Sequence, residues 1–135
     1  MPIHSTSIVP RFGELDPYNH VNHAAYVAYF EAARCVALSD IGMALPDLSD
    51  RGIQIVVTNL EVKFRVAATA RDSLKVYTEV KEMRRASSIW LHRLVRESDQ
   101  KLLVESTITL GICDSAGRPT RPPDDLNLAL KLLSG

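Results

Sequence analysis

The densest group of side chains that could do chemistry lies between residues 14 and 31 of this 135-residue chain. It contains carboxylates, imidazoles, amides and phenols: Glu14, Asp16, Asn19, His20, Asn22, His23, Tyr26, Tyr29 and Glu31. Asp16 stands six residues before Asn22, and asparagine is a residue type that often caps the start of a helix. This spacing predicts a carboxylate on the loop that leads into a helix.

A carboxylate beside a helix start suits acyl transfer. The first N–H groups of a helix lack partners within the helix and carry partial positive charge, so they can hold an oxyanion that develops on a carbonyl. A nearby carboxylate can attack the carbonyl carbon or activate a water molecule. An acidic residue at such a position is more often a cap or a solvated side chain, and spacing alone leaves both interpretations of Asp16 open.

Metal binding is a further interpretation of Asp16, His20 and His23. The two histidines straddle the predicted helix start and do not lie on one helical face. No third nitrogen or sulfur ligand is evident, whereas catalytic zinc usually has three well-placed protein ligands. We therefore expect neither a metal nor a cofactor.

The segment after this loop has the composition of a long helix. Residues 23–42 contain no proline, and five alanines lie between His23 and Ala37. Asn22 is a good N-cap, and Gly42 fits the end of the helix. Apolar residues cover more than one stripe, which predicts a buried helix of about 19 residues, about 28 Å long.

The remainder of the chain is predicted to be mostly β-strand. Strands are expected at 3–11, 53–66, 73–80, 87–96 and 102–113, with loops at 12–22 and 43–52 and a tail helix at 124–133. Short turns between consecutive strands favour an antiparallel sheet. One such sheet and one long apolar helix predict an α+β fold in a single domain over residues 1–135, with the curved sheet wrapped around the helix. Its exposed edges predict a homodimer, and a tetramer is also compatible.

Composition excludes several classes of protein. Apolar residues make up 46% and charged residues 24%, as in an ordinary globular domain. The 16 basic residues balance the 16 acidic ones, which gives no reason to expect a nucleic-acid or membrane partner. No segment has the length of a membrane span, and the first residues do not resemble a secretory signal, so a cytoplasmic location is the default expectation.

Residues 11–34, RFGELDPYNHVNHAAYVAYFEAAR, resemble the signature of a hotdog-fold family. This family comprises 4-hydroxybenzoyl-CoA thioesterase and the acyl-CoA and acyl-carrier-protein thioesterases. The match consists of Asp16, His20-Val21-Asn22, Tyr26, Glu31 and Arg34 at the family spacing. Segments 63–80 and 102–126 are similar to strands of the same family, so the resemblance covers nearly the whole chain.

The resemblance implies hydrolysis of an acyl-CoA or acyl-carrier-protein thioester to a free acid and a thiol. Asp16 would be the nucleophile or general base. The backbone N–H of His23 would polarise the thioester carbonyl, and its side chain could assist. His20 would organise the loop or take part in catalysis, while Asn22 caps the helix and Tyr26 forms pocket wall or core.

Charged residues outside the first motif have two interpretations each. Glu31 and Arg34 are three apart on the helix and could pair, or Glu31 could contribute to an acyl pocket. Arg65, Arg84 and Arg85 could contact the phosphates of coenzyme A or the pantetheine of a carrier protein, since arginine suits phosphate. They could equally be solvated charges at strand ends.

Two other functions stay open at this point. An acyl-thioester hydratase or dehydratase on the same fold would carry different histidine and acidic motifs, which this sequence lacks. A non-catalytic acyl-CoA-binding module would not need Asp16, but a fold does not by itself fix a function. The sequence identifies neither the acyl group nor the choice between nucleophilic and base-assisted attack.

Overall fold

The computed structural model describes residues 4–134, and its elements follow the predicted order. They are β1 (His4–Ile8), η1 (Phe12–Glu14), α1 (His23–Asp40), α2 (Leu45–Asp50), β2 (Ile53–Phe64), β3 (Leu74–Met83), β4 (Ser87–Arg96), β5 (Lys101–Asp114), α3 (Asp124–Leu130) and η2 (Lys131–Leu133). The prediction of a loop at 43–52 is wrong, because residues 45–50 form the short helix α2. Pro46 stands in the first turn of this helix, where proline is tolerated. The first strand ends at Ile8, before Pro10, and residue 3 of its predicted span lies outside the described residues.

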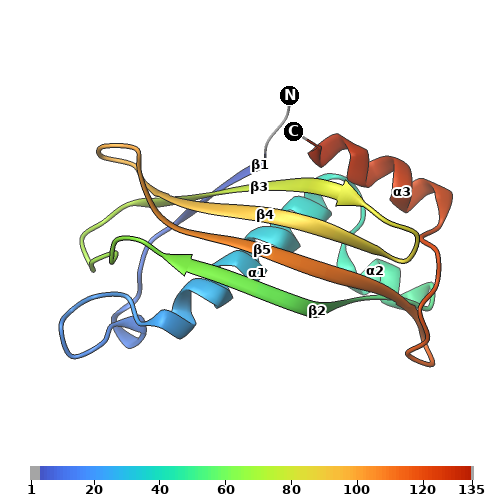
Figure 1. Ribbon diagram of the computed structural model, residues 1–135, viewed down its shortest axis with the longest axis horizontal. Helices are drawn as coiled ribbons and strands as arrows, with labels where there is room; N and C mark the ends of the chain where they lie inside the picture. Colours follow the sequence, from blue (N-terminus) through green and yellow to red (C-terminus); the bar gives the residue numbers. More distant parts are fainter. Residues whose placement is uncertain (1–3, 135) are drawn as a thin grey trace.

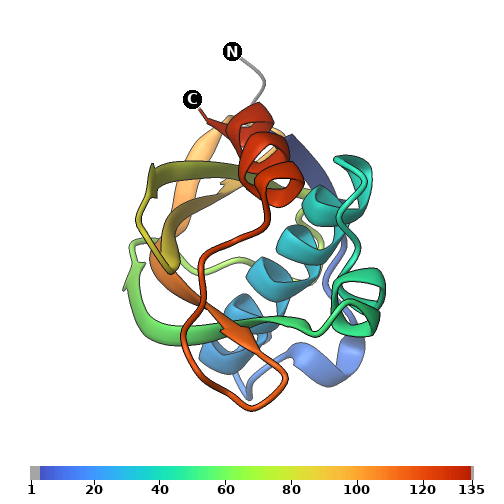
Figure 2. The same cartoon turned by 90° about the vertical axis from the view of Figure 1, so that its right-hand side faces the viewer.

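All five strands form one antiparallel sheet in the order β1-β3-β4-β5-β2 (Figure 1). Only β1 and β2 lie at its edges. Figure 2 shows the sheet curling around α1, with α2 and α3 at the end nearest the viewer. This is the α+β architecture expected of a hotdog fold, and the 18-residue α1 is close to the predicted length.

Only one side of α1 is buried in the protomer. The buried side chains are Ala25, Tyr26, Tyr29, Phe30, Ala33, Arg34, Ala37 and Leu38. Ala24, Ala28 and Ala32 lie on the opposite side and are exposed. The prediction of a helix buried nearly all round is therefore wrong for a single protomer, because the sheet covers one face of α1 and small alanines occupy the other.

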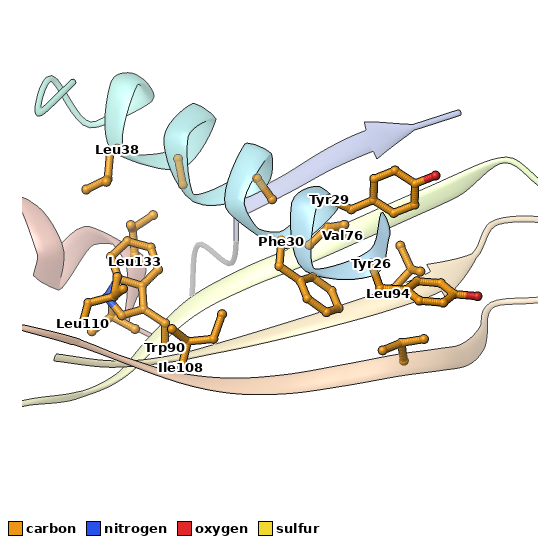
Figure 3. Packing of buried hydrophobic residues seen from close by; sticks show 14 of the residues in the cluster. Tyr26, Tyr29, Phe30, Leu38, Val76, Trp90, Leu94, Ile108, Leu110 and Leu133 are labelled. Atoms are coloured by element: carbon orange, nitrogen blue, oxygen red, sulfur yellow. The ribbon is translucent and has the colours of Figure 1, made fainter. Parts of the chain in front are cut away.

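The core lies between α1 and the concave face of the sheet. Figure 3 shows Phe30 pointing from α1 toward the strands, and Trp90 of β4 beside Leu133. Phe30 and Trp90 are both 0% exposed. Leu126, Leu130 and Leu133 are also buried, so the tail helix closes the end of the core that lies opposite the start of α1 (Figure 1).

A row of buried polar side chains crosses the concave face beneath α1. His92 of β4 stands opposite Thr78 of β3 and Ser106 of β5. His92 Nδ1 lies 3.0 Å from Thr78 Oγ1, and its Nε2 lies 3.4 Å from Arg34 Nη1. Because arginine can only donate, Nε2 is the acceptor and Nδ1–H donates to Thr78. Burial, and then the Arg34 charge, lower the pKa of His92 to about 3, so its ring is neutral.

Within the described part of the chain, no helix has both the length and the apolar character needed to cross a membrane.

The neutral state of His92 predicts a specific sensitivity to acid. Below the ordinary pKa of 6.5 the unfolded chain binds a proton at His92, which the folded protein accepts only near pH 3. As the pH decreases through this window, the free energy of unfolding should therefore decrease by about 1.4 kcal/mol per pH unit because of this group. His92→Gln should lack this slope, so the wild type's advantage in free energy of unfolding should shrink with falling pH. Urea unfolding at several pH values checks this, and parallel curves would contradict it.

Candidate active site

The loop that carries Asp16 is folded back on itself. The Asp16 N–H donates to the His20 carbonyl at 2.7 Å, and Asp16 Oδ1 accepts the N–H groups of Tyr18 and His20 at 2.8 and 3.0 Å. Asn19, at the turn, has a φ of 60°, a left-handed conformation that asparagine tolerates. The carboxylate is thus oriented through one oxygen, while Oδ2 accepts no hydrogen bond from residues 4–134.

Asn22 joins this loop to α1. Its Oδ1 accepts the Ala25 N–H at 3.0 Å, which confirms the predicted cap, and its Nδ2 donates to the Glu14 carbonyl at 2.9 Å. The N–H groups of His23 and Ala24, at the first two helical positions, find no acceptor among the described residues. Such donors can hold a carbonyl oxygen.

The connection between β2 and β3 holds the start of α1 in place. The Val21 N–H donates to the Ala68 carbonyl at 2.8 Å, and the Ala68 N–H donates to Tyr26 Oη at 2.9 Å. His20 forms an isolated bridge with Thr69. Burial raises the pKa of Tyr26, and the Asp16 carboxylate adds to this rise, so Tyr26 stays a neutral phenol and anchors the loop.

Glu14 and Tyr29 brace the same loop from the other side. Tyr29 Oη donates to Glu14 Oε1 at 2.7 Å, and the Arg11 N–H donates to the same oxygen at 2.8 Å. Burial, together with this carboxylate, raises the pKa of Tyr29, which therefore remains a donor. Sequence reasoning placed Glu14 among the reactive residues, but its partner is fifteen positions away, beyond the reach of local patterns.

A pocket of about 280 Å³ opens between the loop, the helix start and the segment after β2. It is lined by Asp16, His20, Val21, His23, Tyr26, Phe64, Arg65, Val66 and Ala67. The structure therefore brings the three predicted catalytic residues together. In the wall formed by residues 64–67, sequence reasoning named Arg65 but missed Phe64, Val66 and Ala67; the ring of Phe64 lies 5.7 Å from that of Tyr26.

Three predicted substrate-binding residues lie away from this pocket. Glu31 is exposed, about 12 Å along α1 from His23. Arg84 and Arg85 belong to the turn between β3 and β4, and the ten residues of β3 place this turn about 30 Å from the pocket end of the strand. The expected pairing of Glu31 with Arg34 is wrong, because Arg34 turns inward to His92.

Arg65 does line the pocket, and it is already paired. Its Nη2 lies 2.6 Å from Glu105 Oε1, and both side chains reach solvent. Hydrogen bonding to Arg65 lowers the pKa of Glu105. Arg65 thus offers a cation at the pocket mouth that a neighbouring carboxylate holds in position.

No group of three or more histidine, cysteine, aspartate or glutamate side chains within residues 4–134 is arranged to hold a metal ion. His20 and His23 share the pocket with Asp16 but complete no such group. The expectation that no metal is needed stays a prediction.

A curved antiparallel sheet around α1, with a carboxylate and open helix N–H groups in one pocket, defines the hotdog class of thioester-processing proteins. The chain belongs to the thioesterase-like superfamily, which it matches over residues 10–130. This membership confirms the predicted fold and the predicted class of enzyme, a thioesterase.

Individual relatives agree with this assignment. The long-chain acyl-CoA thioesterase FadM of Escherichia coli is 27% identical over 109 residues, which is 81% of this chain and 82% of FadM. The acyl-CoA thioesterase YbgC of Haemophilus influenzae is 30% identical over 104 residues, covering 76% of this chain and 75% of YbgC. The structure of a DHNA-CoA thioesterase from Staphylococcus aureus superposes with a TM-score of 0.87 at 25% identity, covering 94% of this chain and 87% of that one.

The helix cap should contribute measurably to stability. Asn22→Ala removes the acceptor for the Ala25 N–H and the donor to Glu14, and should lower the free energy of unfolding by about 1 kcal/mol or more. Asn22→Asp keeps the acceptor but replaces the donor with an oxygen that faces the Glu14 carbonyl, so it should lie between the wild type and Asn22→Ala. Urea unfolding of the three proteins checks this order. An alanine variant as stable as the wild type would show that the cap is dispensable.

Proposed function

We propose that the protein hydrolyses acyl-CoA thioesters in the pocket of Asp16 and releases a free acid and coenzyme A. One observation carries the proposal: the open oxygen of Asp16 and the start of α1, whose first N–H groups find no acceptor within residues 4–134, meet in one pocket. Two relatives named as acyl-CoA thioesterases, FadM and YbgC, support it. An acyl-carrier protein is the alternative carrier, and a cytoplasmic location is part of the same proposal.

The helix start polarises the thioester in this proposal. The carbonyl oxygen accepts hydrogen bonds from the N–H groups of His23 and Ala24, where partial positive charge stabilises the developing oxyanion. These donors are fixed before substrate arrives, because Asn22 and Val21 hold the first turn in position. The stabilisation therefore requires no rearrangement during the reaction.

Asp16 opens the thioester by one of two routes. As a nucleophile, Oδ2 attacks the carbonyl carbon, the carbon–sulfur bond breaks, and water then hydrolyses the mixed anhydride. As a general base, Asp16 takes a proton from a water molecule, whose oxygen attacks the same carbon. Both routes give a carboxylic acid and a thiolate, which takes up a proton.

We assign the remaining pocket residues as follows. The His20 backbone orients the Asp16 carboxylate, and we assign to its side chain, a residue of the pocket lining, the protonation of the leaving thiolate. The His23 ring supplements the backbone donor at the same position. Tyr26 and Asn22 hold the site together and form its wall and cap.

We further propose that a second copy of the chain completes the site. β2 is an edge strand, and its Val57, Leu60 and Phe64 side chains are 51%, 39% and 55% exposed. Long apolar edge strands are normally covered in native proteins. Because Phe64 also lines the pocket, a partner paired along β2 would lie beside Asp16.

Turnover should depend on the charge of Asp16. Asp16→Asn keeps an Oδ1 that can accept the N–H groups of Tyr18 and His20, so the loop should keep its shape. Losing the acid–base group should slow thiol release by about 10²–10⁴-fold, and losing a nucleophile by more. Thiol release and acyl-CoA binding should be measured on the same folded variant.

Asp47→Asn, an exposed change in α2, is the matched control and should retain full activity. If Asp16→Asn keeps more than about a tenth of the rate, far above that range, Asp16 is not the catalytic group. A wild type that binds acyl-CoA without releasing thiol is instead a binding module. Proton exchange at the α-carbon without hydrolysis indicates a hydratase or dehydratase.

Arg65 should recognise the charged carrier. Arg65→Ala should weaken kcat/KM for coenzyme A thioesters more than for short pantetheine thioesters, because only the former carry phosphates. Arg84→Ala and Arg85→Ala should show the same selectivity only if another protomer brings that turn to the pocket. Equal effects of Arg65→Ala on both substrates would show that Arg65 does not recognise the phosphates and is only a surface charge.

The assembly should be at least a dimer at micromolar concentration. Sedimentation equilibrium should give a mass of two or more 15.0 kDa chains. Leu60→Lys places a charge among the exposed apolar side chains of β2 and should shift the protein toward the monomer. A single 15.0 kDa species for the wild type would contradict the proposed interface.

A further inference from the structure

An apolar strip leads from the pocket along the inner side of β2. The pairing with β5 places Phe64 opposite Val104, Val62 opposite Ser106, and Leu60 opposite Ile108. The inner strip, defined as Val57, Leu60, Val62 and Phe64, therefore faces the same side as the core. Phe64 and Leu60 are nevertheless 55% and 39% exposed, because α1 does not cover this edge. An acyl group entering at Phe64 would meet these side chains next.

Two buried polar groups beside this strip lack adequate partners. Ser106, opposite Val62, is 2% exposed, and its hydroxyl has no hydrogen-bond partner among residues 4–134. Arg34 is 7% exposed, and its one side-chain hydrogen bond in the described chain is the 3.4 Å contact with His92. None of the ion pairs within the described residues includes Arg34.

Burial of these two polar groups without partners destabilises the folded protein unless a ligand binds to them. A guanidinium has five N–H donors, and burial of a charge without a counter-ion is unfavourable. Loss of solvent lowers the pKa of Arg34, in agreement with its poor compensation. Ser106 and Arg34 both flank His92, the first across the sheet register and the second by direct contact.

We propose that Arg34 and Ser106 form a subsite for an oxygen atom of the acyl group, so that preferred substrates carry a hydroxyl or carboxylate on a medium-length acyl chain. His92 is a positioning residue, because its Nε2 accepts from Arg34 and orients the guanidinium. Phe30, stacked 5.4 Å from His92, lies seven residues beyond His23. The subsite is therefore about 10 Å along α1 from the thioester carbonyl. This inference rests on the proposed hydrolase function.

The first experiment compares three thioesters of equal chain length. These are octanoyl-CoA, 8-hydroxyoctanoyl-CoA and the mono-CoA ester of octanedioic acid. The oxygenated substrates should have kcat/KM values roughly 10- to 100-fold above that of octanoyl-CoA, the range for hydrogen bonds to charged groups. A larger gain for the carboxylate assigns the selectivity mainly to the Arg34 charge, and a larger gain for the hydroxyl assigns it mainly to Ser106.

Matched serine variants separate recognition from structure. Ser106→Ala deletes an unpaired hydroxyl, so the protein should remain at least as stable, while the preference for the hydroxylated substrate should fall toward unity. Ser88→Ala is the control, because Ser88 Oγ accepts the Trp90 Nε1–H at 2.8 Å. It should lower the melting temperature without changing the preference. Arg34→Met should abolish the preference for the carboxylate.

Binding of the free acids distinguishes this inference from the hydrolase proposal. Calorimetry should show tighter binding of 8-hydroxyoctanoate than of octanoate, with the difference lost in Ser106→Ala. If no thioester is hydrolysed but this difference is present, the hydrolase proposal fails and the subsite stands. If octanoyl-CoA is hydrolysed as fast as both oxygenated substrates, the subsite is overturned and the hydrolase stands. If neither hydrolysis nor the binding difference is found, both are overturned.

Discussion

The first turn of α1 is fixed by hydrogen bonds that approach it from three directions. Asn22 caps it and ties it to the Glu14 carbonyl, the Ala68 carbonyl accepts the Val21 N–H, and Tyr26 returns a bond to the same residue. The first N–H groups of the helix are thereby held in a fixed orientation, although they have no hydrogen-bond acceptor within residues 4–134. The proposed mechanism requires these donors to remain open and the turn to remain rigid. The loop, the β2–β3 connection and α1 meet both needs at once.

The strand β2 also has two roles, because its first half packs against the core and its second half lies at the surface. Ile53 is buried near its start, whereas Phe64 at its end stands in the pocket wall. Between them the ladder is interrupted at Val57/Asn59, and the Thr58 methyl carbon would lie 3.0 Å from a Cβ added at Gly111. A glycine at that position lets the two strands stay close where the register shifts. The strand β2 therefore stays paired with β5 while its environment changes from the core to the surface.

What the sequence predicted depended on neighbours along the chain. The cap at Asn22, the length of α1 and the bounds of β4 are local features, and they were recovered from composition and periodicity. Asp16, His20 and His23 are close in sequence, and they line one pocket. Contacts that join distant residues had no local signal. Arg34 turned inward to His92 instead of toward Glu31, and the turn with Arg84 lies at the opposite end of β3.

The wiring of the sheet also sets the order in which the site can form. β1 pairs with β3 through His4 and Thr78, and the loop with Asp16 is anchored at Ala68 and Thr69. During synthesis the loop with Asp16 is made before Ala68 and Thr69. It therefore has no anchor until about fifty further residues have been added. Contacts across such separations form slowly because loop closure precedes them. The candidate site residues are thus synthesised about fifty residues before the segments that anchor them.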